Sequence, residues 1–270
     1  MTKLIKYTKG ASHALKVLDE NGFDDLLDYS LDLFAYGLGA TVKYKSLINS
    51  DGRIIFGKKN TLIEINENIE FEQKQRFTLA HEIGHLVMHK GIDIHNDNDA
   101  TMSWFNTKEK QAIHSKIESE ANEFASELLM PSKLFIEKQK NKKFSPQLLR
   151  DLADYFKTSL TSVAFKYLQL GNHPICLFHS YNGKVTYWKR PDEFPHFILD
   201  RTKLSVPEDS VASEFYQEGK IYSKNQSKQS IWKSTWFELK DWEDDNDFDF
   251  FEYAIVTSSY NTVLSVVWEE

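Results

Sequence analysis

The chain has 270 residues, of which 41% are hydrophobic and 14% aromatic, so it can bury a sizeable core and has the length of about two domains. Its net charge of -7 argues against a protein whose main task is to wrap nucleic acid, because phosphate binding requires clustered lysine and arginine. A single cysteine excludes an internal disulfide, and no run of about 18 apolar residues is present that could span a membrane. Since no secretory signal is recognisable, we expect a cytoplasmic protein without membrane association.

The acidic excess lies entirely in the C-terminal part of the chain. Residues 1–170 carry 23 basic and 23 acidic side chains, whereas residues 171–270 carry 10 basic and 17 acidic ones. The change coincides with the turn-forming sequence Gly-Asn-His-Pro at 171–174, which we interpret as a domain boundary. Residues 133–168 are basic by contrast, with 8 basic and 3 acidic side chains. We therefore predict three parts: a domain over 1–132, a helical segment over 133–170 and a C-terminal domain over 171–270.

The first elements predicted in chain order are helices followed by a small sheet. Helical apolar spacing over 11–37, interrupted near Gly22, predicts one or two N-terminal helices. Strand character follows in three short stretches, at 40–44, 53–56 and 62–65.

Two longer helices come next. Helical spacing returns over 71–89, and a second helix is predicted over 112–130 because Pro131 cannot continue it. The stretch between them, over 92–108, is polar and rich in Asn and Asp, which predicts a loop.

The rest of the chain changes from helical to strand patterns. Two short helical patterns at 148–156 and 160–168 are joined by three residues, with the spacing of a helix-turn-helix. One helix is expected near 207–217, and alternating apolar residues predict strands at 175–178, 184–188, 253–257 and 263–268. The predicted fold class is α+β: helices with a small three-stranded sheet, then a helix-turn-helix-like segment, then a sheet-rich α/β domain.

The helix over 71–89 carries an HExxH motif, formed by His81, Glu82 and His85. Side chains four residues apart share one face of a helix, so the two histidines can each direct a ring nitrogen at one ion about 2.0–2.1 Å away. Glu82, one step round the helix, would reach a water molecule beside that ion and act as a general base. The motif therefore predicts a zinc-dependent metallopeptidase, against the simpler interpretation of a chance coincidence on an amphipathic helix.

A catalytic zinc site requires a third protein ligand. The helix over 112–130 offers Glu118, and Asn122 follows four residues later on the same face, where it can support a zinc-bound histidine. Any glutamate of this helix taken alone is more typical of a solvated surface, and the pairing with Asn122 is what favours Glu118 as a ligand. Glu120 and Glu123 are expected to point elsewhere. His89 continues the row of the two histidines but drifts round the helix, so we expect it beside the ligands or lining the cleft.

Two strings, QRFTLAHEIGH at 75–85 and ESEANEFASELLMP at 118–131, together closely resemble the motifs of the ImmA/IrrE family of bacterial and phage-borne metallopeptidases. The likeness covers roughly residues 25–170, and residues 171–270 resemble no family that we recognise. It implies a zincin-like domain with gluzincin-type ligation. The resemblance assigns Zn²⁺ as cofactor, Glu82 as the base, and three metal ligands: His81, His85 and Glu118.

The resemblance also implies a regulatory task, because members of this family cut or inactivate helix-turn-helix repressors of mobile elements, phages or stress-response genes. Such a repressor is the expected substrate or partner. By analogy with some relatives, the C-terminal domain would be a small-molecule sensor. The alternative is a zinc-stabilised anti-repressor or toxin-antitoxin component that acts by binding and cuts no peptide bond.

Two further interpretations concern nucleic acid. Residues 145–168 could bind DNA, which the overall acidity of the chain does not favour. The acidic, aromatic stretch over 242–253 could mimic DNA phosphates, although such a run is more often a solvated loop.

Overall fold

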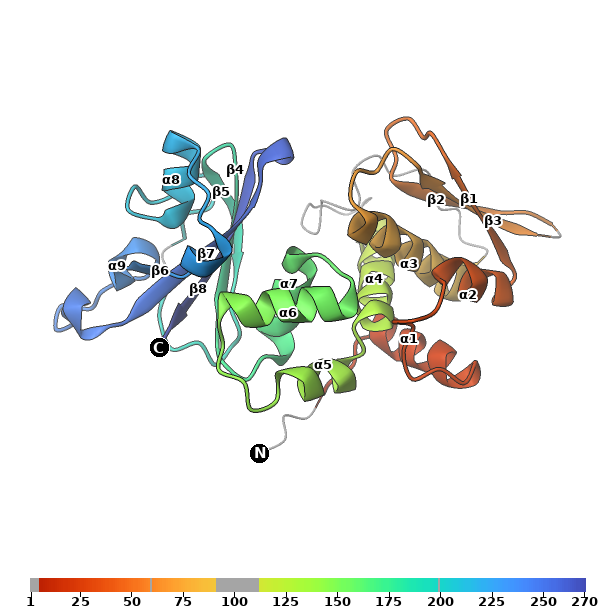
Figure 1. Cartoon of the computed structure of the whole chain (residues 1–270), viewed down its shortest axis with the longest axis horizontal. Helices are drawn as coiled ribbons and strands as arrows, with labels where there is room; N and C mark the ends of the chain where they lie inside the picture. Colours follow the sequence, from red (N-terminus) through yellow and green to blue (C-terminus); the bar gives the residue numbers. More distant parts are fainter. Residues whose placement is uncertain (1–4, 59, 91–111, 199) are drawn as a thin grey trace. The chain divides into compact units, whose positions relative to one another are not determined.

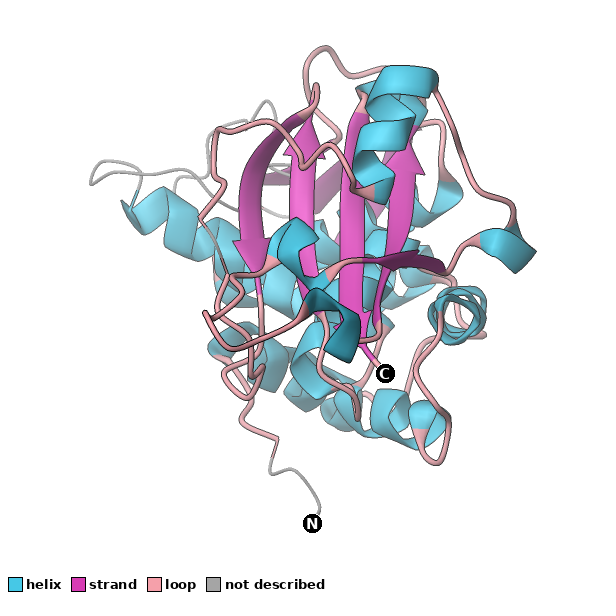
Figure 2. Ribbon diagram, turned by 90° about the vertical axis from the view of Figure 1, so that its left-hand side faces the viewer, coloured by secondary structure: helices cyan, strands magenta, loops and turns pink. Residues whose placement is uncertain are grey.

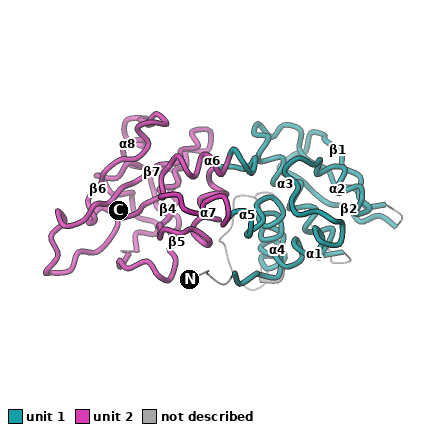
Figure 3. The backbone as a smooth tube through the Cα atoms, turned by 60° about the horizontal axis from the view of Figure 1, so that its bottom comes forward, with its two compact units in different colours: residues 1–135, 154–159 teal, residues 136–153, 160–270 magenta. Residues whose placement is uncertain are grey.

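Two compact units make up the computed structural model, which describes residues 5–58, 60–90, 112–198 and 200–270 (Figures 1 and 3). The first unit comprises residues 1–135 and 154–159, and the second comprises residues 136–153 and 160–270. Within the described ranges, no helix is long and apolar enough to cross a membrane. The loop predicted over 92–108 lies outside the described residues.

The first unit consists of helices and a small mixed sheet. Its main elements are α1 (Lys9–Glu20), α2 (Leu31–Gly37), β1 (Ala40–Lys45), β2 (Gly52–Phe56), β3 (Thr61–Asn66), α3 (Glu72–Met88) and α4 (Ala112–Leu129). The sheet has the order β1-β3-β2, in which β1 runs parallel and β2 antiparallel to β3. The small three-stranded sheet expected from the sequence is confirmed.

The helix α3 is the centre of this unit. All its residues from Thr78 to Leu86 are buried, which is not the pattern of a surface helix with one apolar face. It packs against β2, β3 and α4. A Cβ atom on Gly84 would lie 3.2 Å from the Ala121 Cα atom, so the absence of a side chain at Gly84 lets α3 and α4 approach closely. The buried polar side chains of α3 are thereby brought next to those of α4.

Three helices follow α4. The helices α5 (Ser132–Gln139) and α6 (Pro146–Phe156) contribute residues to both units, and α7 (Leu160–Leu170) belongs to the second. The pair α6 and α7 corresponds to the two short helices expected from the sequence, and Lys157, with a φ of 53°, lies in the turn after α6. Its helix-turn-helix character stays a prediction, as does the division into three parts.

The sequence did not predict α5. The carboxylate of Glu127, buried near the end of α4, accepts hydrogen bonds from the backbone N–H and the hydroxyl of Ser132 at 2.8 and 2.6 Å. This cap begins a new helix directly after Pro131.

The second unit contains an antiparallel sheet of the order β5-β4-β8-β7-β6, and Figure 2 shows its strands side by side. Its elements are β4 (Cys176–Tyr181), β5 (Lys184–Lys189), α8 (Val211–Glu218), β6 (Gln229–Ile231), α9 (Lys233–Trp236), β7 (Phe250–Thr257) and β8 (Thr262–Glu269). Four of the five strands were predicted. The three-residue β6 and the four-residue α9 are too short to carry a periodic signal, and they were missed.

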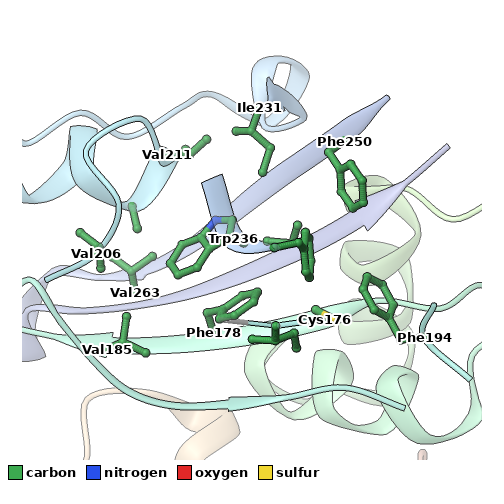
Figure 4. Close-up of a cluster of buried hydrophobic side chains, with 14 residues drawn as sticks. Cys176, Phe178, Val185, Phe194, Val206, Val211, Ile231, Trp236, Phe250 and Val263 are labelled. Carbon is green, nitrogen blue, oxygen red and sulfur yellow. The ribbon is translucent and has the colours of Figure 1, made fainter. Parts of the chain in front are cut away.

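The core of the second unit lies between the sheet and its covering helices (Figure 4). Phe178 and Trp236 stack there with ring centroids 4.2 Å apart. The fully buried carboxylate of Glu252 accepts hydrogen bonds from the backbone N–H groups of Val211 and Ala212, the Trp236 indole and the Ser265 hydroxyl. Glu252 therefore fastens the start of α8 to the sheet.

Candidate metal centre

The HExxH residues lie in the buried middle of α3. His81, Glu82 and His85 are 4%, 6% and 2% exposed. The Nε2 atoms of the two histidines are 2.9 Å apart, and their rings meet edge to face. The spacing of four residues thus brings both imidazoles to one point, as the motif predicted.

Glu118 reaches the same point from α4. Its two carboxylate oxygens lie 3.1 Å from His81 Nε2 and 3.2 Å from His85 Nε2. Within the described part of the chain, these three residues form a group whose ligand atoms all lie within 4.8 Å of one another. Ligands of a tetrahedral ion at 2.0–2.1 Å are roughly 3.3 Å apart, so the separations suit a divalent cation.

The chemistry of the three donors also fits a cation. His81 Nδ1 lies 2.9 Å from Asn122 Oδ1, an acceptor, so this nitrogen carries the ring proton and Nε2 presents its lone pair. A second imidazole nitrogen and a carboxylate converge on that lone pair. Because none of these groups needs to donate, a metal ion satisfies all three at once.

The charges in the centre follow from burial and from the contact with Glu118. Burial raises the pKa of Glu82 to about 7, which suits a general base at neutral pH. Burial would also raise the pKa of Glu118, but its close contacts with the His81 and His85 rings hold that pKa well below its usual range. Burial lowers the pKa of His85 to about 4, so its imidazole is neutral. An ionised Glu118 and a neutral His85 are the forms that bind a metal.

His81 behaves differently. Burial opposes its protonation, yet the hydrogen bond and charge of Glu118 and the charge of Glu82 raise its pKa. A metal ion and a proton therefore compete for the same nitrogen of His81.

His89 lies beyond the three ligand atoms, at the C-cap of α3. Its Nδ1 atom is 2.9 Å from Nδ1 of His85, and its Nε2 atom is 3.2 Å from an oxygen of Glu120. Glu120 in turn accepts a hydrogen bond from Lys9 Nζ at 2.7 Å. The expectation that His89 lies beside the ligands agrees with this position.

Two contacts of the centre had no signal in the sequence analysis. Glu120 does point away from the ligand atoms, as expected, but it is buried against His89 and is not on a solvated face. At the start of β2, a Cβ atom on Gly52 would lie 3.1 Å from Glu82 Oε1 and 2.6 Å from Thr78 Cγ2. A turn-forming glycine before a strand was visible in the sequence, but its closeness to Glu82 was not.

Comparisons with known proteins concern the same part of the chain. Residues 36–167 match a peptidase family described as the IrrE N-terminal-like domain. Over 76 residues the chain is 37% identical to metallopeptidase ImmA of Bacillus subtilis. The matched stretch covers 28% of this chain and 38% of ImmA. The matched part is thus well under half the length of that relative.

A solved structure of a Mycobacterium tuberculosis transcriptional regulator is similar in fold, with a TM-score of 0.59 at 15% identity. The likeness covers 97% of this chain and 77% of the regulator. At this low identity, the structural similarity supports a conclusion about the fold alone. The helices that carry the HExxH motif and Glu118 both lie inside the range matched by the IrrE-like domain, so the part of the chain that holds the candidate site is similar to the ImmA/IrrE family of metallopeptidases.

Proposed function

We propose that the chain is a zinc-dependent regulatory endopeptidase that cleaves or inactivates a helix-turn-helix transcriptional repressor. The observation that carries the proposal is the convergence of His81, His85 and Glu118 next to the buried carboxylate of Glu82. Two imidazole nitrogens and one carboxylate are a donor set typical of catalytic zinc, which keeps one position open.

Each residue then has one role in hydrolysis. When bound, zinc supplies a Lewis acid that polarises the scissile carbonyl and acidifies the attacking water. Glu82 takes a proton from that water while the water oxygen attacks the carbonyl carbon. As the carbon–nitrogen bond breaks, Glu82 passes the proton to the leaving amine and returns to its starting state. His81, His85 and Glu118 hold the ion.

The proposed partner follows from the family resemblance. Members of this family act on helix-turn-helix repressors, so we propose such a repressor, encoded beside the gene for this chain, as substrate.

The test is the substitution Glu82→Gln, which keeps the shape of the side chain and removes the base. The variant should still bind one zinc ion per chain, whereas cleavage of the repressor, followed by mass spectrometry of the fragments, should fall about 10²–10⁴-fold. Glu72→Gln, an exposed position on the same helix, is the matched control and should cleave normally.

Undiminished cleavage by Glu82→Gln would refute the mechanism. If Glu82→Gln still relieves repression and no fragments form with the wild type, the chain acts by binding alone, which is the non-proteolytic alternative.

A further inference from the structure

A chain of hydrogen-bonding side chains continues from the metal centre to the N-terminal helix. It runs from His85 to His89, from His89 to Glu120 and from Glu120 to Lys9, with separations of 2.9, 3.2 and 2.7 Å. His89 and Glu120 are 1% and 6% exposed, whereas the Lys9 side chain is 56% exposed. This series of hydrogen-bonded side chains therefore starts at the candidate ligand His85 and ends at Lys9 on the surface of α1.

The donors and acceptors fix a single direction along this chain. If His85 binds the metal through Nε2, its ring proton is on Nδ1 and is donated to His89. His89 Nδ1 must then accept, so the proton of His89 is on Nε2 and is donated to Glu120. Glu120 must be an ionised acceptor, and the ammonium of Lys9 favours that state.

Among the described residues, Glu120 is the acceptor that faces His89 Nε2, and without it no described side chain on this side selects the tautomer of His89. The other tautomer would place two N–H groups against each other across the 2.9 Å that separates the Nδ1 atoms of His85 and His89. To avoid this contact, the His85 ring would have to rotate, and its Nε2 atom would then no longer face the centre. His81 needs no such chain, because Asn122 accepts from it directly.

The approach of α1 is built for this contact. A Cβ atom on Gly10 would strike the backbone oxygen of Glu120, so the glycine next to Lys9 lets α1 lie directly on α4. Since α1 precedes the matched range 36–167, this support comes from outside the part of the chain that the family match covers.

We infer that Glu120, held by Lys9, is a positioning residue that orients the candidate ligand His85 for metal binding through His89. The inference rests on the proposed function, because it assumes that His85 binds a metal. It assigns Glu120 no contact with the substrate or with the ion.

The test compares Glu120→Leu, which removes the acceptor, with Glu120→Gln, which keeps a carbonyl oxygen for His89. Zinc affinity is measured by competition with a chromophoric chelator, and ligand geometry by the visible spectrum of the cobalt-substituted protein. Glu120→Leu should weaken zinc binding about 10–100-fold and alter the cobalt spectrum, and Glu120→Gln should recover part of both. Lys116→Leu, at an exposed position of the same helix, is the control and should change neither.

A second measurement reads the tautomer directly. In the zinc-loaded wild type, ¹⁵N NMR of the histidine rings should find His89 protonated on Nε2 and His85 on Nδ1. The reverse assignment for His89, or a folded Glu120→Leu variant with wild-type zinc affinity and cobalt spectrum, would overturn the inference.

If Glu120→Leu does not fold, Lys9→Met provides the test instead. The Lys9 side chain is half-exposed, so its replacement leaves the core intact. It should weaken zinc binding in the same direction, and an unchanged affinity would count against the inference. Failure of the proposed function would give a different result. In that case the wild type would bind no zinc, or His81→Ala would bind zinc as tightly as the wild type does.

Discussion

The two histidines of the centre differ in what holds their second ring nitrogen. His81 meets the amide oxygen of Asn122, a neutral acceptor from α4, whereas His85 meets another imidazole. Asn122 is 3% exposed, so no solvent replaces its oxygen when it is removed. A buried N–H left without an acceptor costs about 1–3 kcal/mol, and this cost opposes the tautomer that metal binding requires.

Asn122→Leu should therefore weaken zinc binding by about 10–100-fold, because His81 loses the acceptor that fixes its ring proton on Nδ1. Asn122→Asp keeps an acceptor oxygen in the same place and is the matched control, with an affinity close to that of the wild type. Competition with a chromophoric chelator measures both. Equal affinities of the two variants would show that Asn122 does not select the tautomer.

At the scale of elements, the centre depends on how closely three helices approach one another. Gly84 lets α3 lie against Ala121 of α4, and Gly10 lets α1 lie against the backbone of α4 at Glu120. Interiors are packed so tightly that an added methyl group at such a crossing forces neighbouring atoms to shift. The candidate metal ligands and the side chains that contact them lie on these same helices.

Gly10→Ala should destabilise the protein by about 1–3 kcal/mol, because its Cβ atom would strike the Glu120 backbone oxygen and move α1 away from α4. Gly37→Ala is the control: it ends α2 and nothing lies within 4 Å of its added Cβ atom, so stability should change by less than about 1 kcal/mol. Urea unfolding measures both. A Gly10→Ala variant as stable as Gly37→Ala would contradict the close crossing.

The hairpin of β4 and β5 gives the second unit a dependence on pH. His179 stacks on Tyr187 with ring centroids 4.8 Å apart, and burial lowers its pKa from 6.5 to about 4. The folded state thus binds fewer protons than the unfolded chain between these values. The stabilisation by neutral His179 is complete above about pH 6.5 and is lost as the pH falls toward 4.

Lowering the pH from 7 to 4.5 should therefore cost the wild type roughly 1–2 kcal/mol more than it costs His179→Phe, a variant that keeps a ring against Tyr187. Urea unfolding followed by tryptophan fluorescence at both pH values measures the difference. Parallel losses in the two proteins would show that His179 titrates normally in the folded state.

At the scale of the whole molecule, metal binding and the sheet core belong to different units. His81, His85 and Glu118 lie in the first unit, whereas every tryptophan except Trp104 belongs to the second. A ligand stabilises only the structure that binds it, by about 2.7 kcal/mol at a concentration a hundred times its Kd. Because α7, α8 and α9 belong to the second unit, a helix signal does not separate the two units, whereas backbone hydrogen exchange measured peptide by peptide does.

Chelation with EDTA should speed backbone hydrogen exchange in α3 and α4 and leave exchange in the strands of the second unit unchanged. His81→Ala, which lacks one ligand, should have lost this sensitivity to the chelator. If EDTA speeds hydrogen exchange in both units of the wild type, the two units unfold as one cooperative body.

Local pattern was sufficient to predict most elements and to select the residues that meet at the candidate metal centre. The HExxH spacing, the strand patterns before it and the pair Glu118 and Asn122 each depend on residues a few positions apart, where helix and strand geometry fix the neighbours. The short elements β6 and α9 were not predicted, because a stretch of three or four residues is too short to show hydrophobic periodicity. The start of α5 escaped because Glu127 caps it from the preceding helix.

Sequence alone determined which residues could bind a metal and which one could act as base. Only the tertiary structure decided that Glu120 supports His89, that Lys9 reaches Glu120 across 111 positions, and that Gly52 lies beside Glu82. The physical reason is that these contacts join separate elements. Helical periodicity places a side chain on a face, but the packing of α1 and α3 on α4 determines what that face meets.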